Sequence, residues 1–225
     1  MLVDPINGTN STLLCVAATI YTLEGDFVSA IKCCRDPISL EMYSILVVLY
    51  LRIQRVELAE IALGHMGEFN DDATITQLTM SFFNLYNGGS SSSSLGTESG
   101  GGTTKQQQQQ ASAEAETLFQ ELIDKYGDSI VMLMNGKAIS LMQQSKFEAA
   151  SKLLMTALSK NAQDAETLAN LISCSLQMGK SMEFVKRYVQ QLKSFAPKHP
   201  FVKKLSQMES AFDEAAGQYL SKLSK

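Results

Sequence analysis

Apolar residues recur at three- and four-residue steps along most of this chain, which is the spacing of one face of an α-helix. The first such segment begins near Ser11 or Thr12, either of which can cap a helix. Its apolar residues are Leu14, Ala17, Ala18 and Tyr21. Gly25 interrupts the pattern, which resumes over residues 27–34 until Pro37 stops it. We therefore predict a first pair of antiparallel helices.

The same alternation of apolar segments and breaks predicts four further helical hairpins and a final helix. The predicted segments are 40–53 with 56–66, 71–86 with a helix from 113, then 130–160, 165–195 and 201–219. The last of these carries apolar residues on one face and follows the final hairpin directly. We expect it to act as a capping helix, which a repeat array requires at its end.

A short block of residues also returns along the chain at a spacing close to 34. Its clearest copies centre on Gly25-Asp26-Phe27, Ser145-Lys146-Phe147 and Gly179-Lys180. A period of this length is typical of tetratricopeptide repeats, which are stacked helix–turn–helix units. We therefore predict an all-α fold, a tetratricopeptide-like α-solenoid of about five helical hairpins plus a C-terminal capping helix. Residues 1–225 would form a single array.

One segment, residues 87–112, breaks this pattern because it is rich in Gly, Ser and Gln. It has too few apolar groups to offset the entropy of ordering, so we predict a disordered insert. The helix that resumes at about Ala113 has the spacing of a second helix, which places the insert inside the third hairpin. The alternative is a linker between two independent domains, which would leave residues 71–86 without a partner helix.

Composition narrows the class of protein. With 19 Lys and Arg against 23 Asp and Glu, the net charge is −4, so the basic stripe of a nucleic-acid-binding protein is not expected. The four cysteines have neither CxxC spacing nor a paired histidine, so we expect buried free thiols in a reducing compartment. The chain begins without the pattern of a signal peptide, and its apolar runs are shorter than a membrane span. We expect a soluble intracellular protein.

Catalytic motifs are missing from the sequence. His65 and His199 are each isolated, and no phosphate-binding glycine loop, nucleophile elbow or metal-ligand spacing occurs. We therefore expect no enzyme activity, no cofactor, no metal and no small-molecule substrate. A binding or scaffolding role is the remaining class.

In tetratricopeptide arrays the first helix of each unit lines the concave face. Setting the units to begin near Ser11, Leu40, Asp72, Val131 and Ala165 directs a mainly apolar, Met-rich set of side chains inward. The predicted partner-binding residues are Cys15, Thr19, Val48, Leu51, Thr76, Met80, Phe83, Met132, Asn135, Ile139, Met142, Ser173 and Leu176. Such a groove suits an amphipathic helix or a folded segment of a partner. A register shifted by one residue, with some of these side chains in the packing between helices, is the alternative.

A co-chaperone that binds acidic C-terminal peptides needs several cationic or amide side chains around one carboxylate. Only Arg52, Asn135 and Lys137 are candidates here, and they do not cluster in the assumed register. This use of the fold is therefore disfavoured.

An ordered series of short segments resembles one family, the epsilon subunit of coatomer, a coat of vesicles that travel from the Golgi to the endoplasmic reticulum and within the Golgi. The resemblance covers most of the chain outside the insert. It is carried by residues 71–78, Phe119-Gln120-Glu121, 133–138, Phe147-Glu148-Ala149-Ala150, 166–172, Gly179-Lys180, Arg187-Tyr188, Gln191-Leu192-Lys193, 199–203 and Phe212-Asp213.

The resemblance implies an all-helical solenoid that grips the C-terminal domain of the coatomer alpha subunit, contacts other coat subunits indirectly and performs no catalysis. It also implies a cytoplasmic protein peripheral on Golgi membranes and transport vesicles. Members of the family are usually longer at the N-terminus by several helices, so the resemblance covers their C-terminal part. The alternative is a generic tetratricopeptide adaptor that binds peptides, such as a co-chaperone.

Overall fold

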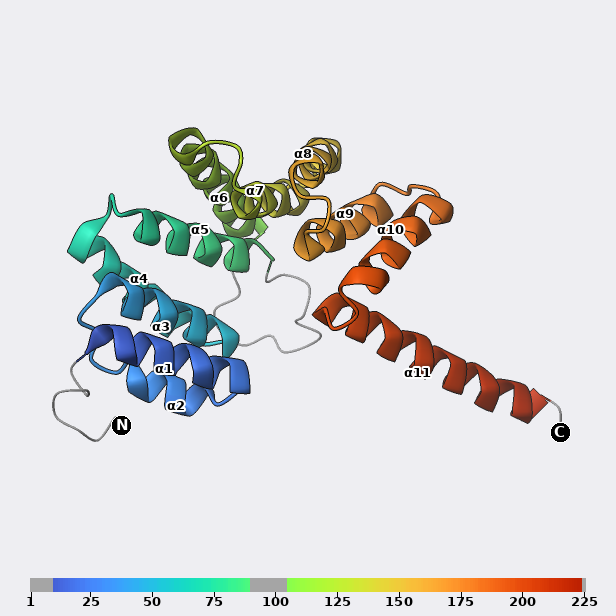
Figure 1. Cartoon of the computed structure of the whole chain (residues 1–225), viewed down its shortest axis with the longest axis horizontal. Coiled ribbons are helices and arrows are strands. Elements are labelled where there is room, and N and C mark those ends of the chain that lie inside the picture. The colour runs from blue at the N-terminus through green and yellow to red at the C-terminus, as the bar shows by residue number, and fades with distance from the viewer. Residues whose placement is uncertain (1–9, 90–104, 224–225) are drawn as a thin grey trace. The chain divides into compact units, whose positions relative to one another are not determined.

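The computed structural model describes residues 10–89 and 105–223, with side chains through Tyr219, and within these ranges it is helical, with no strand (Figure 1). The helices are α1 (Ser11–Glu24), α2 (Phe27–Cys33), α3 (Leu40–Arg52), α4 (Val56–Asn70), α5 (Thr74–Gly89), α6 (Lys105–Tyr126), α7 (Val131–Gln143), α8 (Phe147–Lys160), α9 (Ala165–Gln177), α10 (Met182–Phe195) and α11 (Pro200–Leu223). They form five hairpins, α1–α2 through α9–α10, followed by one C-terminal helix. The predicted all-α class and number of hairpins are confirmed.

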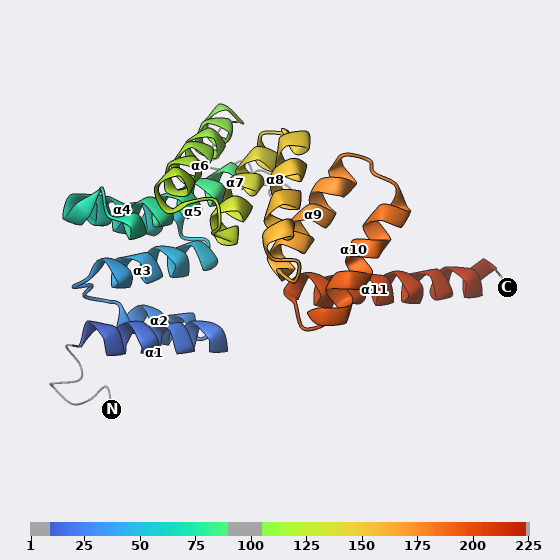
Figure 2. The ribbon, with the colours of Figure 1, turned by 45° about the horizontal axis from the view of Figure 1, so that its top comes forward.

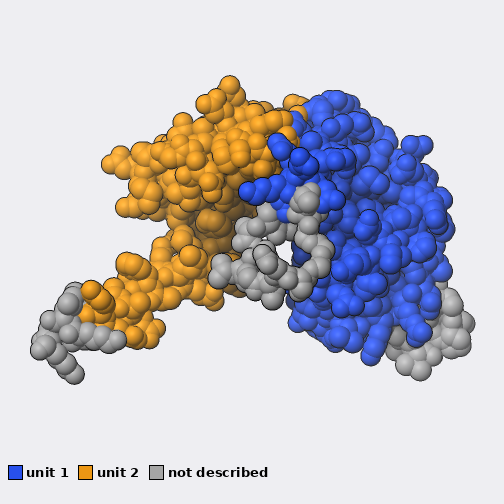
Figure 3. Space-filling model, turned by 180° about the vertical axis from the view of Figure 1, so that it is seen from behind, with its two compact units in different colours: residues 1–127 blue, residues 128–225 orange. Residues whose placement is uncertain are grey.

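The chain divides into two compact units, residues 1–127 and 128–225 (Figure 3). In the first unit α1 contacts α3, and α3 contacts α5, so the first helices of successive hairpins are neighbours. Clusters of buried side chains hold this unit together. One gathers Val47, Leu51, Ala59, Ala62, Leu63, Met66 and Phe83 from α3, α4 and α5. Another joins Ala18, Cys34 and Leu46.

Local chemistry fixes the ends of the first hairpin, but the residue that caps α1 is Asn10, and the predicted cap at Ser11 or Thr12 is wrong because both residues lie inside the helix. The Asn10 side chain accepts a hydrogen bond from the backbone N–H of Leu13 at 3.2 Å, which caps α1. Gly25 ends α1 with φ 84°, a left-handed conformation that glycine adopts without a Cβ clash. Asp26 then caps α2 by accepting from the N–H of Ser29 at 3.0 Å. The break between the helices therefore follows directly from residues 25 and 26.

The third hairpin joins α5 to α6 across the insert. Ala115, Phe119 and Leu122 are buried, and α6 packs on α5 within the first unit, as expected for two helices of one hairpin. The predicted bounds of disorder are wrong at both ends, because residues 87–89 continue α5 and residues 105–112 form the first two turns of α6. Glutamine is a good helix former, and Gln110 donates to Glu114 one turn later at 3.0 Å. Residues 90–104 lie outside the described part of the chain.

The second unit is built from α7 to α11 around one apolar core. Its fully buried side chains include Leu154, Leu168, Leu171 and Leu192. Only the start of α11 joins this core, since Val202 is 6% exposed whereas Met208 and Phe212 are 63% and 73% exposed. Figures 1 and 2 show α11 running past the α9–α10 hairpin after its first turns. The apolar contact of the C-terminal helix with the last hairpin is thus made by its N-terminal residues, and further along α11 Glu209 pairs with Lys193 of α10 at 3.2 Å.

No helix among the described residues has both the length and the apolar content that a membrane span requires.

Candidate partner-binding surface

The predicted binding residues lie on the first helices of the hairpins, α1, α3 and α5 in one unit and α7 and α9 in the other. Their exposure decides which of them can meet a partner. Those exposed to solvent are Thr19, Val48, Met132 and Leu176. Those that are partly buried are Cys15, Met80, Ile139, Met142 and Ser173. Those that are buried are Leu51, Thr76, Phe83 and Asn135.

The predicted register of α5 is wrong by one residue over its second half. Phe83 is 7% exposed and belongs to the core of the first unit, whereas Phe82 is 39% exposed. Thr76 is fully buried as well, and its hydroxyl donates to the backbone carbonyl of Asn70 at 2.8 Å. Because α5 packs against α3, α4 and α6, three sides of it are covered, and the periodicity of one helix does not show which side stays open. The open side of α5 carries Phe82 and Tyr86.

A cleft of about 380 Å³ lies where α3 meets α5. It is lined by Val48, Leu51, Arg52, Phe82 and Tyr86. Two of these residues, Val48 and Leu51, are predicted binding residues. The two aromatic residues, Phe82 and Tyr86, were not predicted, because the assumed register of α5 was one residue off. The atoms that these five residues present to the cleft are almost all carbon.

Beneath this cleft the walls are fixed by packing. Leu51 is only 8% exposed and belongs to the same cluster as Val47 and Phe83. The ring of Phe82 meets the buried ring of Phe119 edge to face, with 5.9 Å between centroids. A partner would therefore meet a preformed apolar surface, whose side chains lose little freedom on binding.

The predicted contact Asn135 has an internal role in the second unit. Its Nδ2 donates to Thr167 Oγ1 at 2.9 Å and to Asp164 Oδ2 at 3.2 Å, which ties α7 to the N-terminus of α9. Thr167 also donates to Asp164 from both its backbone N–H and its hydroxyl. Asn135 is 7% exposed, so it holds two helices together and does not present an amide to a ligand.

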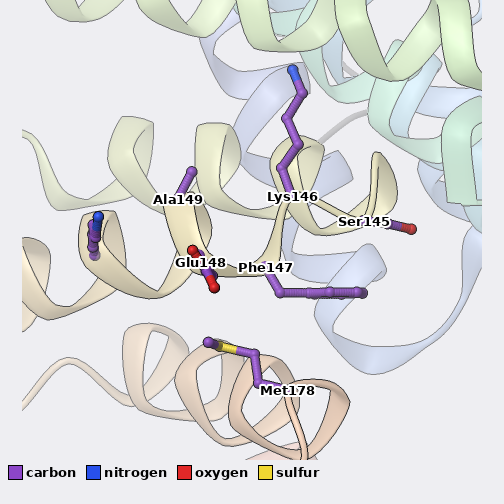
Figure 4. A pocket seen from close by; sticks show the side chains of 7 residues that line it. Ser145, Lys146, Phe147, Glu148, Ala149 and Met178 are labelled. Atoms are coloured by element: carbon purple, nitrogen blue, oxygen red, sulfur yellow. The ribbon is translucent and has the colours of Figure 1, made fainter.

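A second cavity, of about 670 Å³, opens in the second unit at the turn between α7 and α8. Its lining residues are Ser145, Lys146, Phe147, Glu148, Ala149, Lys152 and Met178. Figure 4 shows the Lys146 side chain directed away from Met178, with Glu148 between α8 and that methionine. The charged groups diverge instead of converging on one point, so this cavity lacks the arrangement of a ligand site.

The surroundings of the histidines and cysteines are not those of catalytic residues. His199 Nε2 lies 3.1 Å from Glu166, and His65 lies 3.5 Å from Glu68 one turn further along α4. Burial raises the pKa of the Cys34 thiol to about 12, with smaller contributions from Cys15 and Cys33, so it stays protonated and unreactive at neutral pH. Across residues 10–89 and 105–223, no three His, Cys, Asp or Glu side chains have an arrangement that could hold a metal ion.

Comparison with known proteins finds a family that matches this chain. The chain matches the coatomer epsilon subunit family over residues 1–94 and 103–220. The chain belongs to this family. Among curated relatives, coatomer subunit epsilon-2 of Oryza sativa subsp. indica is 36% identical over 96% of this chain and 64% of its own length. Coatomer subunit epsilon-1 of Arabidopsis thaliana is 34% identical over 95% of this chain and 65% of its own length.

A more distant member of the coatomer epsilon family, from Dictyostelium discoideum, is 30% identical over 96% of this chain. The chain spans 64% to 65% of the length of these relatives. The family predicted from the short sequence segments is therefore confirmed.

Solved structures support the fold of this coatomer epsilon family member. A thermophilic TPR protein of Thermus thermophilus superposes with a TM-score of 0.71 over 90% of this chain and 99% of its own, at 12% identity. A tetratricopeptide repeat protein of Parabacteroides merdae gives a TM-score of 0.67 over 87% of this chain and 69% of its own, at 17% identity. These likenesses confirm the predicted tetratricopeptide-like α-solenoid, and at such identities they concern the fold alone.

Proposed function

We propose that this chain is a structural subunit of the coatomer vesicle coat, which binds and stabilises the C-terminal domain of the coatomer alpha subunit through its concave face. The observation that carries the proposal is membership of the coatomer epsilon family over nearly the whole chain. The coat subunits that it does not touch would be reached indirectly, through the alpha subunit.

The surface of α3 and α5 supports this proposal physically. Val48 and Phe82 are 38% and 39% exposed and lie beside one another at the same cleft. Burying apolar surface contributes about 25 cal/mol per Å² removed from water, so a partner that fills the cleft gains stability from both side chains. Because the cleft walls are already packed, little of that gain would be spent on ordering these side chains.

The second unit offers a smaller surface of the same kind. Met132 on α7 and Leu176 on α9 are 50% and 49% exposed, and α7 and α9 are neighbours. Methionine adapts to irregular partners because its unbranched side chain has several low-energy rotamers. In the proposed complex this surface would hold a second part of the alpha-subunit domain.

The proposed cellular location and transport steps follow from a role in the coatomer coat. The protein would be cytoplasmic, peripheral on Golgi membranes and transport vesicles, and active in Golgi-to-ER and intra-Golgi transport. It would bind no nucleic acid. The alternative function is a generic tetratricopeptide adaptor or co-chaperone, which binds peptides from many proteins.

Affinity capture of the intact chain from cell extract separates these two functions. We expect the alpha subunit and the other coat subunits to be recovered together and identified by mass spectrometry. Capture with Val48→Asp should lose them all, whereas Val28→Asp, at an exposed valine on the second helix α2, should retain them. Recovery of chaperones in place of coat subunits would favour the adaptor.

A further inference from the structure

We propose that the cleft between α3 and α5 recognises a particular feature of its partner, an apolar side chain with a carboxylate beside it that pairs with Arg52. This inference rests on the proposed function, because the partner that carries this feature is taken to be the alpha subunit. It adds a charge requirement that an apolar groove alone does not impose.

The apolar part of the feature follows from the walls of the cleft. Val48 and Arg52 are one turn apart on α3, and Phe82 and Tyr86 are one turn apart on α5, so two short stripes face the same space. A space of about 380 Å³ bounded by aliphatic and aromatic carbon favours a branched or aromatic side chain over a polar one. The anchor should therefore be a residue such as Leu, Ile or Phe.

The charged part follows from Arg52, which lines the cleft and is exposed. Its side chain makes no ion pair with any described residue, and the nearest acidic residues in sequence are Glu41 and Glu57. An exposed guanidinium without a carboxylate partner among the described residues favours an anionic group on the partner.

The apolar walls and Arg52 together specify the partner segment more narrowly than exposed apolar residues alone would. A guanidinium donates two parallel hydrogen bonds to a carboxylate, and the pair strengthens when a neighbouring apolar contact excludes water. A partner segment that inserts an apolar residue at Val48 and Phe82 would bring an adjacent Asp, Glu or C-terminal carboxylate to Arg52. A segment with a lysine or arginine at that place would be rejected.

Titration of the intact chain with the purified C-terminal domain of the alpha subunit tests this inference. Arg52→Gln should weaken binding about tenfold, and raising the salt concentration should weaken the wild type more than this variant. Arg35→Gln, at an exposed arginine in the turn before α3 of the same unit, is the matched control and should bind as the wild type does. A scan of the alpha-subunit domain that changes each acidic residue to lysine should find one variant whose binding recovers with Arg52→Glu.

Each outcome has a distinct meaning. If the wild type binds the domain and Arg52→Gln binds equally well at every salt concentration, the charge pairing is wrong while the proposed function stands. If no lysine variant is rescued by Arg52→Glu, the carboxylate on the partner is wrong. If the wild type fails to bind the domain, both this inference and the proposed function are overturned.

Discussion

Two pairs of equivalent helices, α3–α5 in the first unit and α7–α9 in the second, use their polar residues differently. Between α3 and α5 a hydrogen bond of 2.9 Å joins Ser44 and Thr79. Thr79 gives its own hydroxyl hydrogen to the carbonyl of Ile75, so Ser44 is the donor. Between α7 and α9 the Asn135 amide joins Asp164 and Thr167 in a buried network.

This difference separates an open apolar surface from a closed polar connection. Beside the contact of α3 with α5, Val48 and Phe82 are exposed at an apolar cleft. The α7–α9 pair places its amide where the helices meet, so Asn135 is closed to a partner. Equivalent pairs of helices thus leave different side chains open to a partner.

The largest effect is expected from neighbouring phenylalanines on α5. Phe83→Asp should destabilise the first unit by about 4 kcal/mol or more, because it buries an unpaired carboxylate in the core. Phe82→Asp should cost about 1–2 kcal/mol, from the lost edge-to-face contact with Phe119. Chemical denaturation followed by circular dichroism measures both. Equal losses for the two variants would contradict the register of α5 described here.

A smaller effect is expected at the connection of α7 to α9. Asn135→Ala should lower the free energy of unfolding by about 2 kcal/mol, because two hydrogen bonds are lost and a small cavity is left. Ser44→Ala, at the corresponding contact of α3 with α5, should cost about 1 kcal/mol. The comparison fails if the serine variant is the more unstable of the two in the same denaturation series.

The smallest effect concerns a surface carboxylate in each unit. Hydrogen bonding from Lys160, at 2.7 Å, and then its charge hold the pKa of Asp128 below its usual 3.8. Since the folded pKa is lowered, the stabilisation is present above the unfolded pKa and is lost as pH falls through the folded pKa. Asp128→Asn should therefore be less stable than the wild type at neutral pH and equal to it at the lowest pH.

Salt distinguishes this carboxylate from its counterpart in the first unit. Hydrogen bonds from Ser29, which is uncharged, are the main cause that lowers the pKa of Asp26, and the charge of Lys32 adds a smaller effect. The stability difference of Asp128→Asn should therefore shrink in high salt by more than that of Asp26→Asn. Thermal unfolding at two salt concentrations measures both, and an equal response to salt would argue against the ion pair.

Helix positions and turns were predictable because local chemistry decides them. Gly25 and Asp26 mark the turn of the first hairpin in sequence and in structure, whereas the cap of α1 is Asn10, one residue before the predicted Ser11. The bounds of the insert were not predictable, because a glutamine run is compatible with disorder and with helix. Packing of Ala115 and Phe119 on α5 extends α6 backward through that run to Lys105.

The binding surface was predictable only in part. A repeat period indicates which helix faces inward but tolerates a shift of one residue, and on α5 that shift exchanges Phe82 for Phe83. Asn135 was predicted as a contact because the assumed register of the first helices directs it inward. Its partner Thr167 lies 32 residues away, and no local pattern reveals such a pairing.

Isothermal titration of the chain with the C-terminal domain of the alpha subunit tests the central claim most directly, using Val48→Asp and its matched control Val28→Asp. Both valines are exposed, at 38% and 64%, and circular dichroism verifies that both variants fold. We predict at least a roughly thirtyfold loss of affinity for Val48→Asp and a change within about threefold for Val28→Asp. An unchanged affinity for Val48→Asp, or a larger loss for Val28→Asp, would contradict binding at the α3–α5 surface.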